Sequence, residues 1–237
     1  MEKLNPVISP MCGRYSQVYN FEQLEAQLQI PLSSAVSIPA NYNVAPTQDA
    51  MVLTNEQPNI LQPYRWGLVP HWSKDLSHGA RMINARREGI ATKPSFRIPI
   101  RQRRCLVFAD SFYEWRRSGQ QKLPYRILRT NDDILVMAGI WDVWQKEGRR
   151  LHTFSIITTE PNAEMQGIHN RMPVLLLNHD QQQQWLQELP LEDTLELLQT
   201  PPDGVLRYYR VSQRVNSVRN DGPELHEAVS DDPLTLF

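Results

Sequence analysis

Residues 105–109 read Cys-Leu-Val-Phe-Ala, an unbroken apolar run with a charged residue on either side. A run this short, bounded by polar residues, favours a strand that is buried on both faces. Other segments along the chain are apolar or alternate between apolar and polar residues, which also predicts strands. They are residues 51–54, 60–66, 124–129, 134–141, 152–158 and 205–211.

Helical periodicity is limited to a few segments. Residues 20–29 carry Leu24 and Leu28 at helical spacing, with Asn20 as a candidate N-cap. Residues 179–189 and 191–198 show the same periodicity. Many strands, few helices and long proline-rich connections predict an α+β fold with antiparallel or mixed sheets, not a βαβ repeat. Because no glycine-rich linker divides the chain, we expect one domain.

Composition excludes several classes of protein. The chain has 237 residues, 41% hydrophobic and 22% charged, which is enough to bury a sizeable core. Its 2 cysteines build no disulfide framework, and no CxxC pair is present to hold zinc. No run of 18 apolar residues predicts a membrane span, and residues 1–10 lack the apolar region of a secretory signal. We therefore expect a cytoplasmic protein that needs no metal or cofactor.

The net charge of −1 hides a strong asymmetry. Residues 65–130 hold 15 Lys and Arg against 4 Asp and Glu, whereas residues 1–64 and 131–237 are both net acidic. A basic middle segment is typical of a face that binds a polyanion such as nucleic acid. The alternative is that these arginines pair with the acidic flanks inside the fold. The segment 67–104 is long for a structureless connection, and such loops are often functional.

Cys12 follows Met11 in the stretch Met-Cys-Gly-Arg-Tyr. Removal of this methionine would leave Cys12 with a free α-amine beside its thiol. An α-amine has a pKa of about 8, so part of it is neutral and nucleophilic at neutral pH. Such an aminothiol attacks an aldehyde through nitrogen and then closes a thiazolidine ring through sulfur. The alternative is a small buried cysteine, which is our interpretation of Cys105.

Three further stretches carry residues suited to chemistry. Asn84 and Arg86 suit the orientation of a nucleophile and the clamping of a phosphate. Glu114 lies between aromatic residues just past the buried strand and suits general acid–base work. His169, with Arg171 nearby in a proline-terminated loop, suits proton transfer beside an anion. Each also has a structural interpretation: Asn84 could cap a turn, Glu114 could pair with a nearby arginine, and His169 could be a structural residue with its hydrogen bonds made.

Aromatic and basic residues alternate in residues 64–72, Tyr-Arg-Trp-Gly-Leu-Val-Pro-His-Trp. Such a surface stacks the bases of a single strand and holds its phosphates. Trp66 and Trp72 are the candidates for stacking, and the alternative for Trp66 is a place in the core.

Seven motifs occur in an order that is specific when they are taken together. They are MCGRY at 11–15, YNVAPT at 42–47, RWGLVPHW at 65–72, INAR at 83–86, CLVFADSFYEW at 105–115, IHNRMP at 168–173 and VSQRVNSVRNDG at 211–222. They resemble the SRAP family (SOS-response-associated peptidases, the abasic-site processing proteins). The resemblance implies one α+β domain over residues 11–222 with a barrel-like core. Residues 1–10 would be an extension and residues 223–237 an acidic tail.

The resemblance also implies a function. It is that of a DNA-damage response protein that binds abasic sites in single-stranded DNA, near duplex junctions, and shields them by a covalent thiazolidine crosslink. Cys12 would be the nucleophile and Asn84 would position it or the opened sugar. Glu114 would act as acid and base in ring opening and Schiff-base formation, and His169 would move the proton of the sugar hydroxyl. The residues implied to contact DNA are Arg14, Arg86 and Arg171 at phosphates, and Pro46, Trp66 and Trp72 along the channel.

One feature departs from the family, in which the cysteine follows the initiator methionine. Ten residues precede Met11 here, and an amide nitrogen at Cys12 cannot form a Schiff base. We therefore expect translation to start at Met11. The alternatives are that residues 1–10 are removed by cleavage, or that this member has lost crosslinking and only binds DNA.

Two other functions compete with the crosslinker. One is a cysteine peptidase or amidohydrolase, autoproteolysis included, that uses Cys12 and His169. The other is a non-covalent binding module for single-stranded DNA. We expect a monomer, active in the cytoplasm and associated with the nucleoid at sites of damage.

Overall fold

A closed barrel of five strands forms the centre of the computed structural model, which describes residues 13–34 and 39–229. Strands β11, β10, β7, β4 and β5 follow one another around it, each antiparallel to the next. Parallel pairing of Arg65 with Thr153 and of Trp66 with Phe154 closes the ring. The strands span Asp49–Thr54 (β4), Ile60–Trp66 (β5), Arg104–Ala109 (β7), Leu135–Lys146 (β10) and Arg149–Thr159 (β11).

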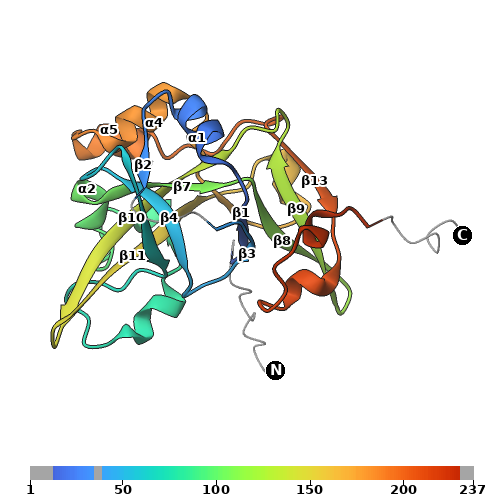
Figure 1. Ribbon diagram of the computed structural model, residues 1–237, viewed down its shortest axis with the longest axis horizontal. Helices are drawn as coiled ribbons and strands as arrows, with labels where there is room; N and C mark the ends of the chain where they lie inside the picture. Colours follow the sequence, from blue (N-terminus) through green and yellow to red (C-terminus); the bar gives the residue numbers. More distant parts are fainter. Residues whose placement is uncertain (1–12, 35–38, 230–237) are drawn as a thin grey trace, which may run out of the picture.

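A second sheet packs against the barrel and is seen on the right in Figure 1. Its order is β13, β9, β8, β1, β3. The bounds are Leu206–Arg210 (β13), Gln121–Arg129 (β9), Ser111–Ser118 (β8), Tyr15–Gln17 (β1) and Asn41–Val44 (β3). Three short strands extend the barrel wall: β2 (Ser33–Ser34) pairs with β5, whereas β6 (Asn84–Arg86) and β12 (Met172–Pro173) pair with β11.

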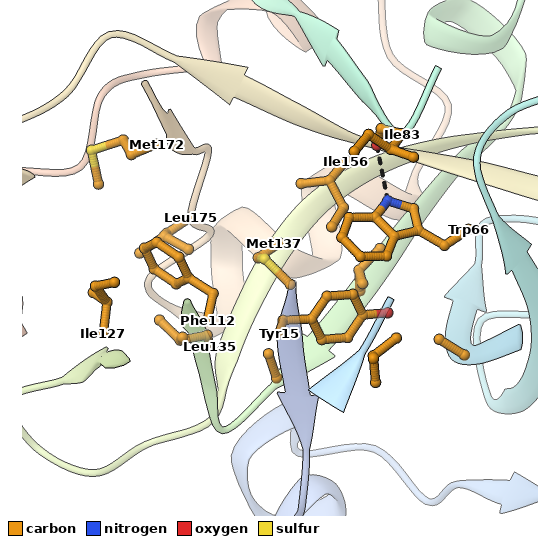
Figure 2. Packing of buried hydrophobic residues seen from close by; sticks show 14 of the residues in the cluster. Tyr15, Trp66, Ile83, Phe112, Ile127, Leu135, Met137, Ile156, Met172 and Leu175 are labelled. Atoms are coloured by element: carbon orange, nitrogen blue, oxygen red, sulfur yellow. Dashed lines mark hydrogen bonds between the residues drawn. The ribbon is translucent and has the colours of Figure 1, made fainter. Parts of the chain in front are cut away.

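Alternation along the strands divides the core into two main clusters. On β7, Cys105 and Val107 belong to the cluster that fills the barrel and the space beneath the second sheet, whereas Leu106 and Phe108 face the helices outside. Figure 2 shows the first cluster, in which Trp66 lies close to Tyr15. Cys105 is fully buried, as predicted, and burial raises the pKa of its thiol far above the ordinary value.

Helices cover one side of the barrel. Helix α1 (Phe21–Leu28) begins at Asn20, whose side chain accepts a hydrogen bond of 2.6 Å from the Gln23 N–H. Helices α4 (His179–Leu186) and α5 (Leu191–Glu196) lie beside it in Figure 1. The remaining elements are short: α2 (Pro99–Gln102), α3 (Ala163–Gln166) and the 3₁₀ turns η1 (Leu76–Arg81), η2 (Arg87–Gly89), η3 (Gln213–Asn216) and η4 (Pro223–His226).

The α+β class, the barrel-like core and every segment that the sequence favoured as strand or helix are confirmed. Two expectations need correction. Glu114 does not follow a strand but lies within β8, which the sequence did not reveal. The acidic tail is expected to begin at residue 223. However, Leu225 is fully buried and the Val229 N–H donates a hydrogen bond to the Arg210 carbonyl, so residues 223–229 pack on the second sheet. No helix among the described residues is long and apolar enough to cross a membrane.

Candidate active site

Glu114 and His169 meet where the second sheet packs against the end of β11. Glu114 lies on the inner face of β8 and its side chain is only 2% exposed. His169 precedes β12, which pairs with the last residues of β11. The Glu114 Oε1 and the His169 Nδ1 are 3.9 Å apart, so the two groups are close but not hydrogen-bonded to each other. The sequence-predicted acid–base pair is therefore assembled from residues 55 positions apart.

The protonation state of His169 follows from its surroundings. Burial lowers the pKa of the imidazole, and a contact with the Arg171 carbonyl opposes this only in part. The ring is therefore neutral near pH 7. The Arg171 N–H donates to Nδ1 at 3.2 Å, which leaves the proton of the neutral ring on Nε2. His169 is thus prepared to accept a proton at Nδ1 beside Glu114.

Strand β1 brings the beginning of the domain to this pair. Tyr15 is paired with Phe112, and the Tyr113 N–H donates to the Arg14 carbonyl at 2.9 Å. Continuing this antiparallel register places Gly13 opposite Glu114. Cys12, the predicted nucleophile, lies outside the described residues.

Asn84 and Arg86 both lie on β6, which runs parallel to the end of β11. Asn84 is level with Ile156 and Arg86 with Thr158, so both are on the part of the barrel that carries β12 and His169. Asn84 is half-buried, whereas Arg86 is exposed. This placement suits Asn84 to contact a group held by the site and Arg86 to contact an anion at its edge.

Arg14 is tied to the C-terminal part of the domain. Its guanidinium donates to the Asn43 side chain at 2.7 Å and to the Val215 carbonyl at 2.8 Å. Asn43, itself 1% exposed, donates in turn to the carbonyls of Ser217 and Asn220. Sequence reasoning missed Asn43, although the residue lies in a quoted motif. It fixes the segment 215–220 beside the first residues of β1.

Arg171, which the resemblance places at a phosphate, is held by groups of the protein itself. Its guanidinium forms a bidentate ion pair with Glu88, at 2.6 and 2.9 Å, and also donates to the Thr158 carbonyl at 2.6 Å. The side chain is 10% exposed. With both terminal nitrogens held by the protein itself, Arg171 anchors η2 to β11. Its contact with a DNA phosphate stays a prediction.

The two candidate tryptophans differ in exposure, since Trp66 is buried and Trp72 is exposed. Trp66 is 0% exposed, and its Nε1–H donates to the Ile83 carbonyl at 2.9 Å, as Figure 2 shows. A ring that presents no surface to solvent cannot stack on a base, so the prediction for Trp66 is wrong and its alternative, a place in the core, is confirmed. Trp72 is 51% exposed and keeps a free face for stacking. Pro46 is half-buried in the turn between β3 and β4, and its contact with DNA stays a prediction.

The loop that carries Trp72 is fixed by Asp142, a residue that sequence reasoning did not single out. Asp142 is 1% exposed and accepts hydrogen bonds from the His71 N–H at 2.9 Å and from the His71 ring at 3.0 Å. The Arg103 guanidinium binds its other oxygen. At the start of the loop, Gly67 has a φ of +118°, and a Cβ there would meet the Gly79 carbonyl at 2.5 Å. The position therefore requires glycine.

Part of the basic middle segment serves the fold itself. Arg103 binds Asp142, Arg126 binds Asp110 at 2.9 Å, and the buried Arg104 donates to backbone carbonyls such as that of Trp185. Nine other cations of this segment are exposed and form the exposed basic set: Lys74, Arg81, Arg86, Lys93, Arg97, Arg101, Arg116, Arg117 and Lys122. The pair of Arg103 with Asp142 agrees with the alternative, pairing with an acidic flank. Binding of a polyanion by the exposed basic set stays a prediction.

The geometry brings two groups that can exchange protons close to the beginning of strand β1. A buried carboxylate and a neutral imidazole can hold and move protons, and exposed arginines can hold an anionic substrate. Among the described residues, no group of three His, Cys, Asp or Glu side chains is arranged to hold a metal ion.

Comparisons with known proteins agree with this arrangement. The chain is 41% identical over 225 residues to the abasic site processing protein YoqW of Bacillus subtilis, covering 92% of this chain and 100% of the relative. It is 32% identical over 219 residues to the abasic site processing protein HMCES of Gallus gallus, covering 78% of this chain and 65% of the relative. A crystal structure of a protein from Bacteroides thetaiotaomicron matches with a TM-score of 0.82 and 27% identity, over 92% of this chain and 100% of that one.

Fold and site together define a class of single-domain β-barrel proteins in which a buried glutamate and a histidine meet beside the first strand of the domain. The family model "SOS response associated peptidase (SRAP)" matches residues 11–218. The chain belongs to the SRAP family, as the seven motifs predicted.

Proposed function

We propose that this protein recognises abasic sites in single-stranded DNA, as part of the DNA-damage response, and links to them through Cys12. The observation that carries the proposal is the buried Glu114–His169 pair beside Gly13, the residue that follows the nucleophile. The relatives YoqW and HMCES are named abasic site processing proteins, which supports an abasic site as the substrate.

The chemistry requires only the aminothiol and proton transfer. The neutral α-amine of Cys12 adds to the aldehyde carbon of the ring-opened sugar and gives a carbinolamine. Loss of its hydroxyl as water leaves a Schiff base. The thiolate then bonds to the imine carbon, the nitrogen takes up a proton, and a thiazolidine closes, so that one water is released overall. Because thiol and amine belong to one residue, the second step needs no further binding event.

Each step moves a proton that a side chain at this site can supply or accept. Glu114 gives a proton to the departing hydroxyl, and the neutral His169 takes one from the attacking or ring-opening group. Arg86 holds a phosphate next to the lesion, and Trp72 stacks on a neighbouring base. We further propose that the protein acts as a monomer in the cytoplasm, at the damaged nucleoid.

A direct test compares two forms of the protein, one starting at Met1 and one at Met11. Each is mixed with a single-stranded oligonucleotide that carries one abasic site, and the products are resolved on a denaturing gel and weighed intact. We expect an adduct from the form starting at Met11, because removal of that methionine frees the Cys12 amine. The Cys12→Ala variant should give none.

The other outcomes identify the competing functions. An adduct from the form starting at Met1, with loss of the N-terminal peptide, would show self-processing by a peptidase activity. Retention of DNA without any adduct in either form would contradict the crosslinking proposal and leave a binding module.

The salt dependence of binding tests the roles of the arginines. Removal of one phosphate contact lowers the slope of log K against log salt concentration by about 0.7 for a single strand. We expect this change for Arg86→Ala, measured by fluorescence anisotropy with an uncleavable abasic analogue.

A matched control is offered by the Glu88–Arg171 pair. The double variant Glu88→Gln, Arg171→Gln removes one positive and one negative charge and so keeps the net charge. Its salt slope should equal that of the unaltered protein, because the guanidinium of Arg171 is already held by Glu88. A fall in slope here, with none for Arg86→Ala, would exchange the roles of the two arginines.

A further inference from the structure

A cavity of about 420 Å³ lies between β5 and β11, at the end where His152 and Arg150 lie. The Glu114–His169 site adjoins the other end of β11, near Thr158. His152 and Thr158 are six residues apart on one strand, which corresponds to roughly 20 Å. The cavity is therefore separate from the candidate active site.

The cavity exists because the two strands that close the barrel diverge. They pair at Arg65 with Thr153 and at Trp66 with Phe154, where the barrel closes. Toward the beginning of both strands this pairing ends, and Pro63 has no N–H with which to continue it. Tyr64, Trp141 and His152 close the barrel at this point, with ring centroids 4.8 to 6.4 Å apart. The space outside these rings stays open.

Its lining combines ring surfaces, polar edges and two opposite charges. The His152 ring stacks on Tyr64 at 4.8 Å with an interplanar angle of 28°. The Tyr64 hydroxyl donates to the Gln62 side chain at 3.2 Å, and the Gln62 amide in turn donates to Gln57. Arg150 and Glu56 are exposed lining residues of opposite charge.

The charge state of the lining favours a ligand with a single anionic group. Burial, followed by the charge of Arg150, lowers the pKa of His152, so the imidazole is neutral near pH 7. Burial also raises the pKa of Tyr64 to about 12, which keeps its hydroxyl protonated. Arg150 is then the cationic group of the lining, and Glu56 opposes a ligand that carries several phosphate groups.

We propose that this cavity binds a nucleoside monophosphate unit. A nucleobase has a planar face for the imidazole and the apolar side chains of Ile60 and Pro63, and an edge for the Gln57 and Gln62 amides. Its single phosphate pairs with Arg150. The volume lies within the range of small-molecule sites, and the open end of a β-barrel is a common place for them. This proposal goes beyond the proposed function, because it involves neither Cys12 nor an abasic site.

Isothermal titration calorimetry on the full chain tests the proposal. The four deoxynucleoside monophosphates and dATP are titrated into the unaltered protein and three variants. We expect binding of monophosphates, weaker binding of dATP, and a roughly tenfold loss of monophosphate affinity in Arg150→Ala, since a charge-assisted hydrogen bond is removed. Arg150 is exposed, so its removal should leave the fold intact.

Two variants serve as matched controls. Arg149→Ala removes the same charge from the neighbouring residue, which does not line the cavity. Arg86→Ala removes an arginine at the candidate active site. Both should bind monophosphates as the unaltered protein does. If an undamaged single-stranded oligonucleotide competes with the monophosphates, the ligand is a nucleotide within a DNA strand. If it does not compete, the ligand is a free mononucleotide. Lack of binding at millimolar concentration, or equal affinity in Arg150→Ala, would overturn the proposal.

Discussion

Glu114→Gln should slow formation of the DNA adduct by about 100-fold or more, the usual contribution of a general acid–base group. The substitution preserves the size of a side chain that is 2% exposed and lies 3.9 Å from the His169 ring. It removes the group that can give up and recover a proton while water leaves the carbinolamine. Binding of the oligonucleotide should stay unchanged, because phosphates and bases are held by exposed residues such as Arg86 and Trp72.

Single-turnover kinetics on denaturing gels measure the rate, and anisotropy measures binding on the same samples. Glu160→Gln is the matched control, because Glu160 is an exposed carboxylate just after β11 and is not part of the acid–base pair. It should react at the unaltered rate. If Glu114→Gln reacted equally fast, Glu114 would have no place in the mechanism.

The barrel strands could be predicted because they are buried and consist mostly of apolar residues. β7 is buried along its whole length and is entirely apolar apart from Arg104. β8 is equally buried at Ser111–Glu114, yet it alternates between residues that face the barrel and residues that face the C-terminal segment 211–229. A serine and a glutamate at buried positions conceal such a strand from any pattern of hydrophobicity.

The site residues could be named from their motifs, but their partners could not. Arg171 and Glu88 are 83 positions apart, and only pairing of β6 and β12 with the same strand brings them together. The position of a basic residue in a loop therefore suggested a phosphate contact but did not reveal its ion pair with Glu88. Asn43 and Asp142 were missed for the same reason, since each acts by binding backbone or side-chain groups from distant segments.

The sequence also could not separate the buried Trp66 from the exposed Trp72, which is six positions away. Trp66→Ala should destabilise the protein by about 3–5 kcal/mol, the usual cost of truncating a large buried aromatic residue. The ring is fully buried, meets Tyr15 edge-to-face at 4.9 Å, and lies where β5 and β11 close the barrel. Urea unfolding, followed by tryptophan-independent circular dichroism, measures the loss.

Trp66→Phe separates the ring from its hydrogen bond. Phenylalanine fills most of the space but removes the Nε1–H donor, whereas the Ile83 carbonyl still accepts from the Ile156 N–H at 3.0 Å. Loss of this one hydrogen bond costs about 0.5–1.5 kcal/mol. The folded variant should bind the oligonucleotide as tightly as the unaltered protein, since no surface of Trp66 reaches solvent.

Trp72→Ala should show the reverse behaviour. Its ring is 51% exposed, so its loss should change stability by less than about 0.5 kcal/mol. Loss of one stacked base should weaken single-strand binding by about 1–3 kcal/mol. Loss of DNA affinity in the folded Trp66→Phe variant would contradict this division of roles, because the ring can reach DNA only if the barrel opens at its closing strands. Arg65, Trp66 and their partners on β11 complete the ring of strands, so such opening would also expose the core.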